Sequence, residues 1–275
     1  MRKAAFPRAC ATLLAAAVLA GCAATSSRLH TSEALDAAIA GSHRPEADRA
    51  RDSWRHPKQT LLFFGLRPEM TVVEIAPGAG WYTRVIAPVV RERGRYLAAL
   101  PPLDPGNEVS VRTHAAFRAL TASAPVLDRA GVVPFSPGRV ELGPDGSADL
   151  IVTFRNIHNW MARDVAAAAF TDMYRALKPG GILGVVEHRG NPAVPQDPRA
   201  GTGYVNQGYA IRLIEGVGFR LVATSEINAN PRDTKDYPGG VWTLPPTFAE
   251  GAKDRERLAA IGESDCFTLK FVKPR

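Results

Sequence analysis

The chain has 275 residues, of which 45% are hydrophobic and 22% are charged. This profile is that of an ordinary globular protein, and it excludes collagen, coiled-coil and broadly disordered chains. The net charge of +7 falls to +4 without the first 21 residues, because Arg2, Lys3 and Arg8 are among them. No dense basic patch interleaved with aromatic residues follows, so we expect no nucleic-acid partner.

The amino terminus has the pattern of an export signal. A basic head precedes a short apolar run, residues 9–20, and the segment closes with LAGC at 19–22. The run is shorter than the roughly 20 residues that span a membrane. LAGC resembles the bacterial lipobox, in which cleavage precedes a cysteine that receives lipid, here Cys22. An ordinary cleavable signal, or a cytoplasmic protein with no signal, remains the alternative.

These features predict a lipoprotein signal peptide over residues 1–21 and a small polar tether over 22–31. Residues 32–275 are predicted to form a single domain whose first part, about 32–66, is a helical cap. Cys10 would leave with the signal, so Cys266 would have no cysteine partner for a disulfide or a thiolate metal site. By resemblance to bacterial sorting rules, Ala23 and Ala24 favour the periplasmic face of the outer membrane.

The remaining elements alternate between helices and strands. The cap is expected to contain helices over 32–40, within 44–57, and up to Gly65. A helix that includes residue 166 has Ala166, Phe170, Met173 and Leu177 on its inward face, and another begins near 209 and ends near Gly216. No helix is evident between 228 and 263. Strands are expected at 71–76, 95–100, 148–154, 182–188, 220–225 and 266–272.

This alternation predicts an α/β fold of the Rossmann-like, doubly wound type with a mostly parallel sheet. The near-continuous apolar run at 148–154 is typical of a parallel strand covered on both faces. Two strands close the chain without an evident helix between them, so the last strand is expected to pair antiparallel.

Several stretches resemble the class I S-adenosylmethionine-dependent methyltransferases, and in particular a bacterial branch whose members carry signal sequences. The resemblance covers roughly residues 44–274. The stretches that carry it are RDSWRHP, VVEIAPGAGWYT, TFRNIHNWM, YRALKPGGILGVVEHR and ESDCFTLKFVKP. It implies the class I methyltransferase fold, S-adenosylmethionine as cofactor, and methyl transfer to a small molecule or an envelope component.

The resemblance places the cofactor at the turn after the first strand. Glu74 matches the acid that ends this strand, Gly78 and Gly80 match the second and third glycines, and Ala76 replaces the first. Glycines allow the backbone to approach a ligand closely and to turn into the helix. A tight turn without a ligand is the alternative.

Three further positions bear on the cofactor. Trp81 and Tyr82 follow the turn and offer aromatic faces to a sulfonium cation. The family's ribose-binding acid, expected at the end of the second strand, is absent there, and Asp104 is the first acid beyond it. Either Asp104 folds back into that role or the ribose is held differently.

Polar groups converge where the parallel strands end, which is where doubly wound sheets bind ligands. Methyl transfer needs alignment and, for a protonated nucleophile, a general base. His158 is the first candidate base and His188 the second, while Asn156 is expected to orient substrate and to contact the cofactor. Asn159 is a further amide, and Arg55 or His56 is expected to cap the site. Each has a structural alternative, such as a histidine that merely satisfies backbone groups.

Two further interpretations of the sequence concern a metal site and a function without catalysis. Glu187 with His158 and His188 contains the ligand types of a metal site, but neighbouring strand residues point to opposite faces, so we expect no metal. The alternative to an enzyme is a non-catalytic lipoprotein of this fold that binds another ligand or a partner, suggested by the missing ribose acid and by the export signal.

Overall fold

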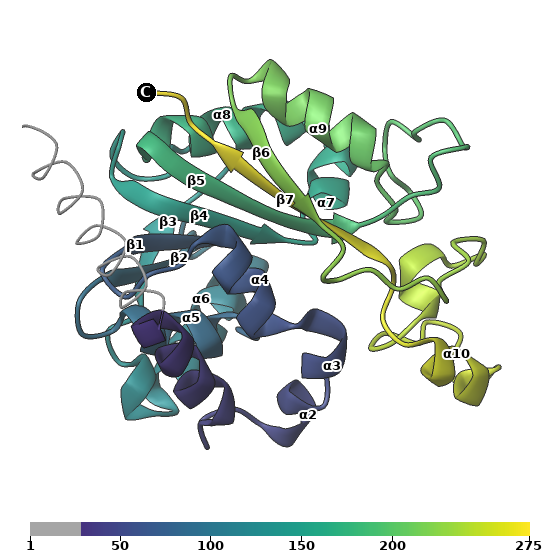
Figure 1. Ribbon diagram of the computed structural model, residues 1–275, viewed down its shortest axis with the longest axis horizontal. Helices are drawn as coiled ribbons and strands as arrows, with labels where there is room; N and C mark the ends of the chain where they lie inside the picture. The colour runs from purple at the N-terminus through teal and green to yellow at the C-terminus, as the bar shows by residue number, and fades with distance from the viewer. Residues whose placement is uncertain (1–28) are drawn as a thin grey trace, which may run out of the picture.

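The computed structural model describes residues 29–275 (Figure 1), so the predicted signal peptide, Cys22 and most of the tether lie outside the described residues. Its centre is a seven-stranded sheet of order β3-β2-β1-β4-β5-β7-β6. The strands are β1 (Thr71–Ile75), β2 (Arg95–Leu100), β3 (Gly131–Pro134), β4 (Ala148–Phe154), β5 (Leu177–His188), β6 (Arg220–Ser225) and β7 (Cys266–Val272).

The direction of the last strand confirms the expected topology. Strands β1 to β5 pair in parallel, whereas β7 lies between β5 and β6 and is antiparallel to both. The sheet is therefore mostly parallel with an antiparallel end, which is the predicted fold class.

Helices cover both faces of the sheet. Apart from a helical stretch at residues 29–40, they are α2 (Glu46–Arg49), α3 (Asp52–Arg55), α4 (Pro57–Phe64), α5 (Thr83–Val90), α6 (Glu108–Ala122), α7 (Ile157–Ala162), α8 (Ala166–Ala176), α9 (Gln207–Gly216) and α10 (Arg255–Ile261). The 3-10 turns are η1 (Pro125–Leu127) and η2 (Gly240–Thr243).

Alternation along β1 separates the core into two layers. Val73 packs with Phe170 of α8 on one face, whereas Val72 packs with Leu61 of α4 and Val85 of α5 on the other. Side chains on a strand alternate between its two faces, and each face needs its own apolar cover. Figure 1 shows α8 and α9 above the sheet and α4, α5 and α6 below it.

The observed elements differ from expectation in four places. The first helix already includes residue 29 rather than starting at 32. Strand β5 begins at Leu177, because Leu177 pairs with Ala148 and the Gly180 amide donates to the carbonyl of Lys273. The stretch 228–263 contains η2 and α10, and the sequence pattern did not predict α6, α7 or β3.

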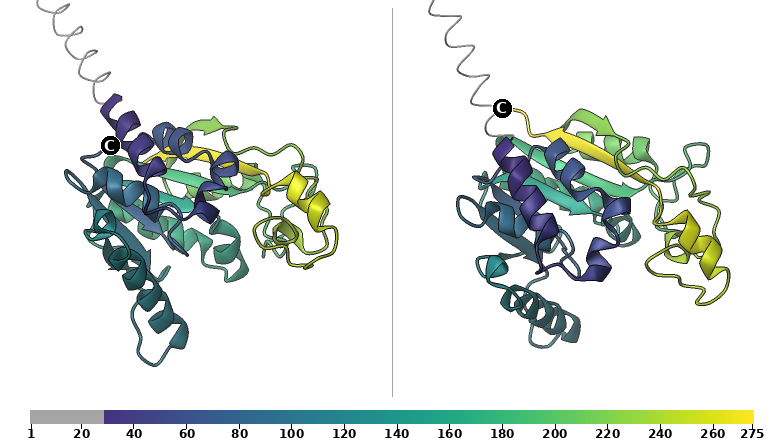
Figure 2. Two further views of the ribbon diagram at one scale, coloured as in Figure 1. Left: turned by 90° about the horizontal axis from the view of Figure 1, so that it is seen from below. Right: turned by 60° about the horizontal axis from the view of Figure 1, so that its bottom comes forward.

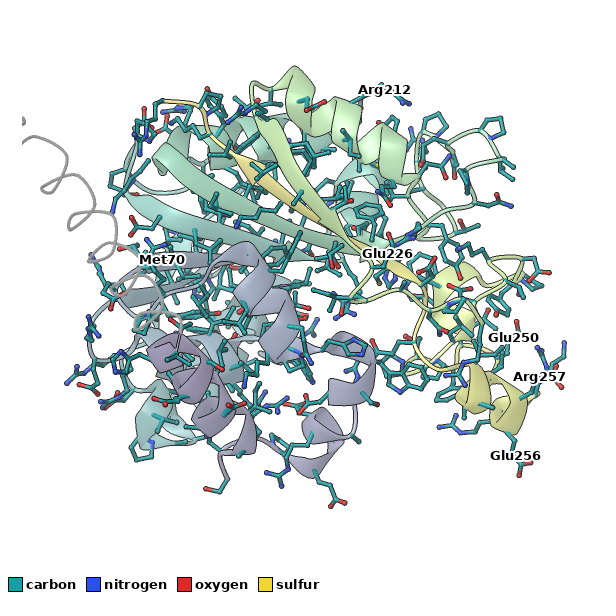
Figure 3. All side chains as sticks on the ribbon, viewed as in Figure 1. Met70, Arg212, Glu226, Glu250, Glu256 and Arg257 are labelled. Atoms are coloured by element: carbon teal, nitrogen blue, oxygen red, sulfur yellow. The ribbon has the colours of Figure 1, made fainter. Side chains whose placement is uncertain are left out.

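The carboxyl ends of β1, β4 and β5 lie between two outlying parts of the chain. One is the short pair α2 and α3, and the other is the C-terminal segment, residues 237–265, which carries η2 and α10 (Figures 1 and 2). Figure 3 shows Glu256 and Arg257 on the outer side of α10, away from the strand ends. Across residues 29–275, we find no helix with the length and apolarity to cross a membrane.

Candidate active site

The turn after β1 has an open position at Gly78. Ala76, Gly78 and Gly80 all have positive φ, at 47°, 60° and 80°. A Cβ placed on Gly78 would meet nothing within 4 Å, so a ligand can approach this part of the backbone. A Cβ on Gly80 would lie 2.2 Å from Cδ2 of Leu120, so this glycine is required by packing against α6.

Glu74 points into the protein. Its Oε2 accepts hydrogen bonds from the Tyr96 hydroxyl at 2.6 Å and from Oγ1 of Thr83 at 3.1 Å, and the residue is only 2% exposed. Burial raises the pKa of Glu74 to about 7, against the opposing effect of these two hydrogen bonds. The carboxylate therefore links β1, β2 and α5, and in this arrangement it does not face a ligand.

Trp81 and Tyr82 are buried against other side chains. The guanidinium groups of Arg44 and Arg55 lie over the Trp81 ring, 5.1 and 4.9 Å from its centroid. Tyr82 stacks on Phe154 at 3.5 Å between centroids. The Trp81 ring thus already forms cation–π contacts with two arginines of the protein itself. These contacts hold Arg55 beside the glycine turn.

Asp104 closes its own loop. Its Oδ1 accepts a hydrogen bond from the Gly106 amide at 2.9 Å, and its amide donates to Oγ of Ser110 at 3.0 Å. Pro101 and Leu103, at the end of β2, are both exposed. The contacts of Asp104 therefore stabilise the loop after β2, and its role as a ribose ligand stays a prediction.

His158 and Glu187 form a buried pair at the ends of β4 and β5. Nδ1 of His158 lies 3.0 Å from Oε1 of Glu187, and the two residues are 6% and 0% exposed. The carboxylate also accepts from the amides of His188 (2.9 Å) and Ile157 (2.6 Å). A carboxylate accepts hydrogen bonds, so in the neutral His158 ring this contact favours the tautomer with the proton on Nδ1 and the lone pair on Nε2.

His188 is held by the C-terminal segment. Its Nδ1 lies 2.5 Å from Oγ of Ser264 and 3.9 Å from Sγ of Cys266. Burial, followed by the positive charge of Arg155, lowers the pKa of His188 well below its usual value. Burial likewise raises the pKa of the Cys266 thiol, to about 12, so this cysteine is an unreactive thiol.

One ligand atom from each of His158, Glu187 and His188 falls within 4.8 Å of the others. The expectation that neighbouring strand residues would keep these groups apart is therefore wrong. However, the positive charges of Arg155 and Arg55 act on His188. A metal cation would be repelled by these charges, so the His158–Glu187 pair is better suited to proton transfer than to metal binding.

The two asparagines have different surroundings. Nδ2 of Asn156 donates to the carbonyl of Ile75 and to Oγ1 of Thr153, both at 3.1 Å, and so ties the end of β1 to β4. Asn159 is exposed on α7. Asn156 therefore positions the strand ends, while Asn159 is free to meet a ligand from solvent.

The C-terminal segment contributes residues that sequence reasoning did not single out. Trp242 of η2 packs edge-on to His158 with 5.9 Å between ring centroids. Glu263 accepts hydrogen bonds from Arg51, Arg55 and Arg155. Trp242 and Glu263 are not adjacent in sequence to the carboxyl ends of the predicted parallel strands, but Glu263 stands within the stretch ESDCFTLKFVKP.

Comparison with known proteins finds a similarity in the central part of the chain. Residues 73–185 match the family model described as "Methyltransferase domain". Within these residues the chain is similar to a methyltransferase domain. This match spans the glycine turn, both asparagines and His158, but ends before Glu187.

Solved structures agree on the fold. A SAM-dependent methyltransferase from Aquifex aeolicus superposes with a TM-score of 0.54 at 17% identity, covering 82% of this chain and 93% of that one. The [4+2]-cyclase SpnF gives 0.57 at 17% identity, with 86% of each chain covered. The mitomycin 7-O-methyltransferase MmcR gives 0.50 at 17% identity, covering 82% of this chain and 56% of that one.

The chain therefore adopts the class I methyltransferase fold, and the match over residues 73–185 together with the fold supports that family. No curated protein matches the sequence significantly.

Proposed function

We propose that this protein transfers a methyl group from S-adenosylmethionine to a small-molecule or envelope acceptor, with His158 as the general base. The observation that carries the proposal is the His158–Glu187 pair, in which Nδ1 lies 3.0 Å from a fully buried carboxylate at the strand ends. It stands beside a turn whose backbone is open at Gly78, within a methyltransferase domain.

The described residues fit S-adenosylmethionine at the turn. The positive φ of Gly78 and the open space beside it suit close approach of an adenosyl ligand to the backbone. Glu74 and Asp104 are committed to contacts within the protein. The cofactor would therefore be held by the turn and the groups around it rather than by these two carboxylates.

When bound, S-adenosylmethionine supplies an electrophilic methyl group. Nε2 of His158 accepts the proton that the acceptor loses, and Glu187 stabilises the imidazolium through the hydrogen bond at Nδ1. Trp242, packed against His158, shields the pair from water. His188 stays neutral because burial and Arg155 lower its pKa, so it serves the site as a hydrogen-bonding group.

The test separates binding from catalysis. The full chain is titrated calorimetrically with S-adenosylmethionine and S-adenosylhomocysteine, and transfer of labelled methyl to an envelope extract is followed. His158→Gln should retain cofactor binding and lose transfer by at least about 100-fold. His30→Gln, at an exposed position, serves as the matched control. Equal transfer by His158→Gln and the control would exclude the histidine as base.

A second candidate function is a non-catalytic protein of this fold that binds another ligand or a partner. Two observations favour it: Glu74 is turned inward, and Asp104 closes its own loop. Absence of any heat with either cofactor form, in a folded chain, would favour this reading.

We also propose that the protein is exported and anchored by lipid at Cys22, on the periplasmic face of the outer membrane. The LAGC sequence and the following Ala23 and Ala24 support this. Processing should be sensitive to globomycin, an inhibitor of lipoprotein signal cleavage. A chain whose processing ignores the inhibitor would contradict the lipoprotein assignment.

A further inference from the structure

Three guanidinium groups share one carboxylate beside the candidate active site. Arg51 and Arg55 come from the start and end of α3, Arg155 follows β4, and Glu263 belongs to the C-terminal segment. Glu263 lies 2.6 Å from Nε of Arg51, 3.0 Å from Nε of Arg55 and 3.2 Å from an Nη of Arg155. We refer to Arg51, Arg55 and Arg155 as the arginine cluster.

The cluster lies between the glycine turn and the histidines. Arg55 packs on Trp81, which directly follows Gly80. Arg155 and Arg55 are both close enough to His188 to lower its pKa, after the larger effect of burial. A group bound by the cluster would therefore belong to a ligand that occupies the strand ends.

The positive charge of the cluster exceeds the negative charge of Glu263. The pKa of Glu263 is lowered, because the charges of the three arginines outweigh the burial that acts to raise it. Burial and the charge of Arg155 lower the pKa of Arg55 to about 9 despite the attraction of Glu263. Glu187 also acts on Arg155, so two carboxylates act on three guanidinium groups, and the positive charge left unbalanced favours an additional anion.

The arginine cluster also has hydrogen-bond donors that Glu263 does not use. Within residues 29–275, Glu263 occupies Nε of Arg51 and Arg55 and one Nη of Arg155, and we find no hydrogen-bond acceptor for the other Nη groups. The three side chains are 25%, 10% and 18% exposed, so a small anion can reach them. Planar guanidinium groups match the geometry of a carboxylate.

A purely structural role does not explain this arrangement. One arginine would suffice to fix Glu263 and so hold the C-terminal segment to α3, whereas each further buried guanidinium costs desolvation. In addition, Arg155 stands at φ 60°, a conformation that is unfavourable for a residue with a side chain. Such a cost is typical of a residue held in place for binding.

We propose that the arginine cluster binds the carboxylate of a ligand that enters the strand-end site. The inference rests on the proposed function, because it assigns part of the site used there. This carboxylate has two possible sources: the aminoacyl end of the cofactor, or an acid group on the methyl acceptor. The experiment below distinguishes them.

Arg51→Gln is the test variant, because Arg51 is the most exposed member of the cluster, and Arg49→Gln is its matched control on the exposed surface two residues earlier. Dissociation constants are measured on the full chain with S-adenosylhomocysteine and with 5′-methylthioadenosine, which lacks the aminoacyl group. In a second arm, thermal stabilisation by acetate and citrate is compared with that by sodium chloride of equal ionic strength.

If the cofactor supplies the carboxylate, Arg51→Gln weakens S-adenosylhomocysteine at least about tenfold and leaves 5′-methylthioadenosine unchanged. If the acceptor supplies it, both nucleosides bind as before, but stabilisation by acetate or citrate is lost in Arg51→Gln and kept in Arg49→Gln. If neither arm separates the two variants, the proposal is overturned.

Glu263→Gln gives a readout of opposite sign. Removing the internal carboxylate should increase the stabilisation by a carboxylate ligand, whereas a merely structural ion pair would lower stability without any gain in binding. A wild-type chain that binds neither nucleoside would overturn the proposed function alone, since the acetate and citrate arm still tests the cluster.

Discussion

Replacement of Glu74 by glutamine tests most directly whether the carboxyl group beside the glycine turn is buried with a raised pKa. Glutamine has nearly the same shape, and its carbonyl oxygen can still accept from Tyr96 and Thr83, which both donate to Oε2 of Glu74. The change therefore removes a titratable group while keeping the hydrogen bonds. The difference in the free energy of unfolding between wild type and Glu74→Gln should therefore arise from the titration of Glu74 and should change with pH.

The direction follows from the pKa of the two states. Burial raises the pKa of Glu74 from 4.5 to about 7, so between these values the native state binds a proton that the unfolded state has lost. The contribution of Glu74 to stability is fully present below about pH 4.5 and is lost as the pH rises through about 7. The difference corresponds to about 3 kcal/mol.

The assay is urea unfolding of the full chain at several pH values between 4 and 8. The free energy of unfolding of the wild type should fall, relative to Glu74→Gln, by up to about 3 kcal/mol across this range. Glu69→Gln is the control, because Glu69 is 43% exposed and pairs with Arg93 at the surface. A difference between wild type and Glu74→Gln that does not change with pH would refute the burial argument.

Three further outcomes follow from the structure. Gly80→Ala should destabilise the chain by about 2 kcal/mol, which is more than Gly78→Ala should. Both positions have positive φ, but only at Gly80 would the added Cβ overlap Leu120. Equal losses of stability in thermal unfolding of the two variants would contradict this. His188 has a pKa well below 6.5, mainly through burial, so the native state binds fewer protons than the unfolded state, and the stability that His188 costs should grow as the pH falls below about 6.5. His188→Gln should remove that dependence, and parallel pH curves for the two proteins would count against it. Cys22→Ser should release the protein from membranes in cell fractionation, and unchanged membrane association would exclude a lipid anchor at this residue.

Local patterns in the sequence predict the order of most elements. The apolar run at residues 148–154 predicts β4, and the spacing of Ala166, Phe170 and Met173 predicts the buried face of α8. These patterns are local, since a strand or helix buried on one side must repeat its apolar residues with its own period. The antiparallel last strand also followed from the order of elements.

Long-range contacts decided what each side chain of the site does. The sequence predicts Glu74 as a ligand for the cofactor, whereas the fold buries its carboxylate in a hydrogen bond with Tyr96, 22 residues later. His158 was one of several candidates until the fold placed Glu187, 29 residues later, beside its Nδ1.

The arginine cluster shows the same division. Arg51 and Glu263 are 212 residues apart, and no periodicity in the sequence predicts that they meet. Residue types and local periods fix which groups are available and which element carries them. Only the packing of the sheet against α3 and the C-terminal segment decides which charges face one another, because burial and partners depend on the whole chain.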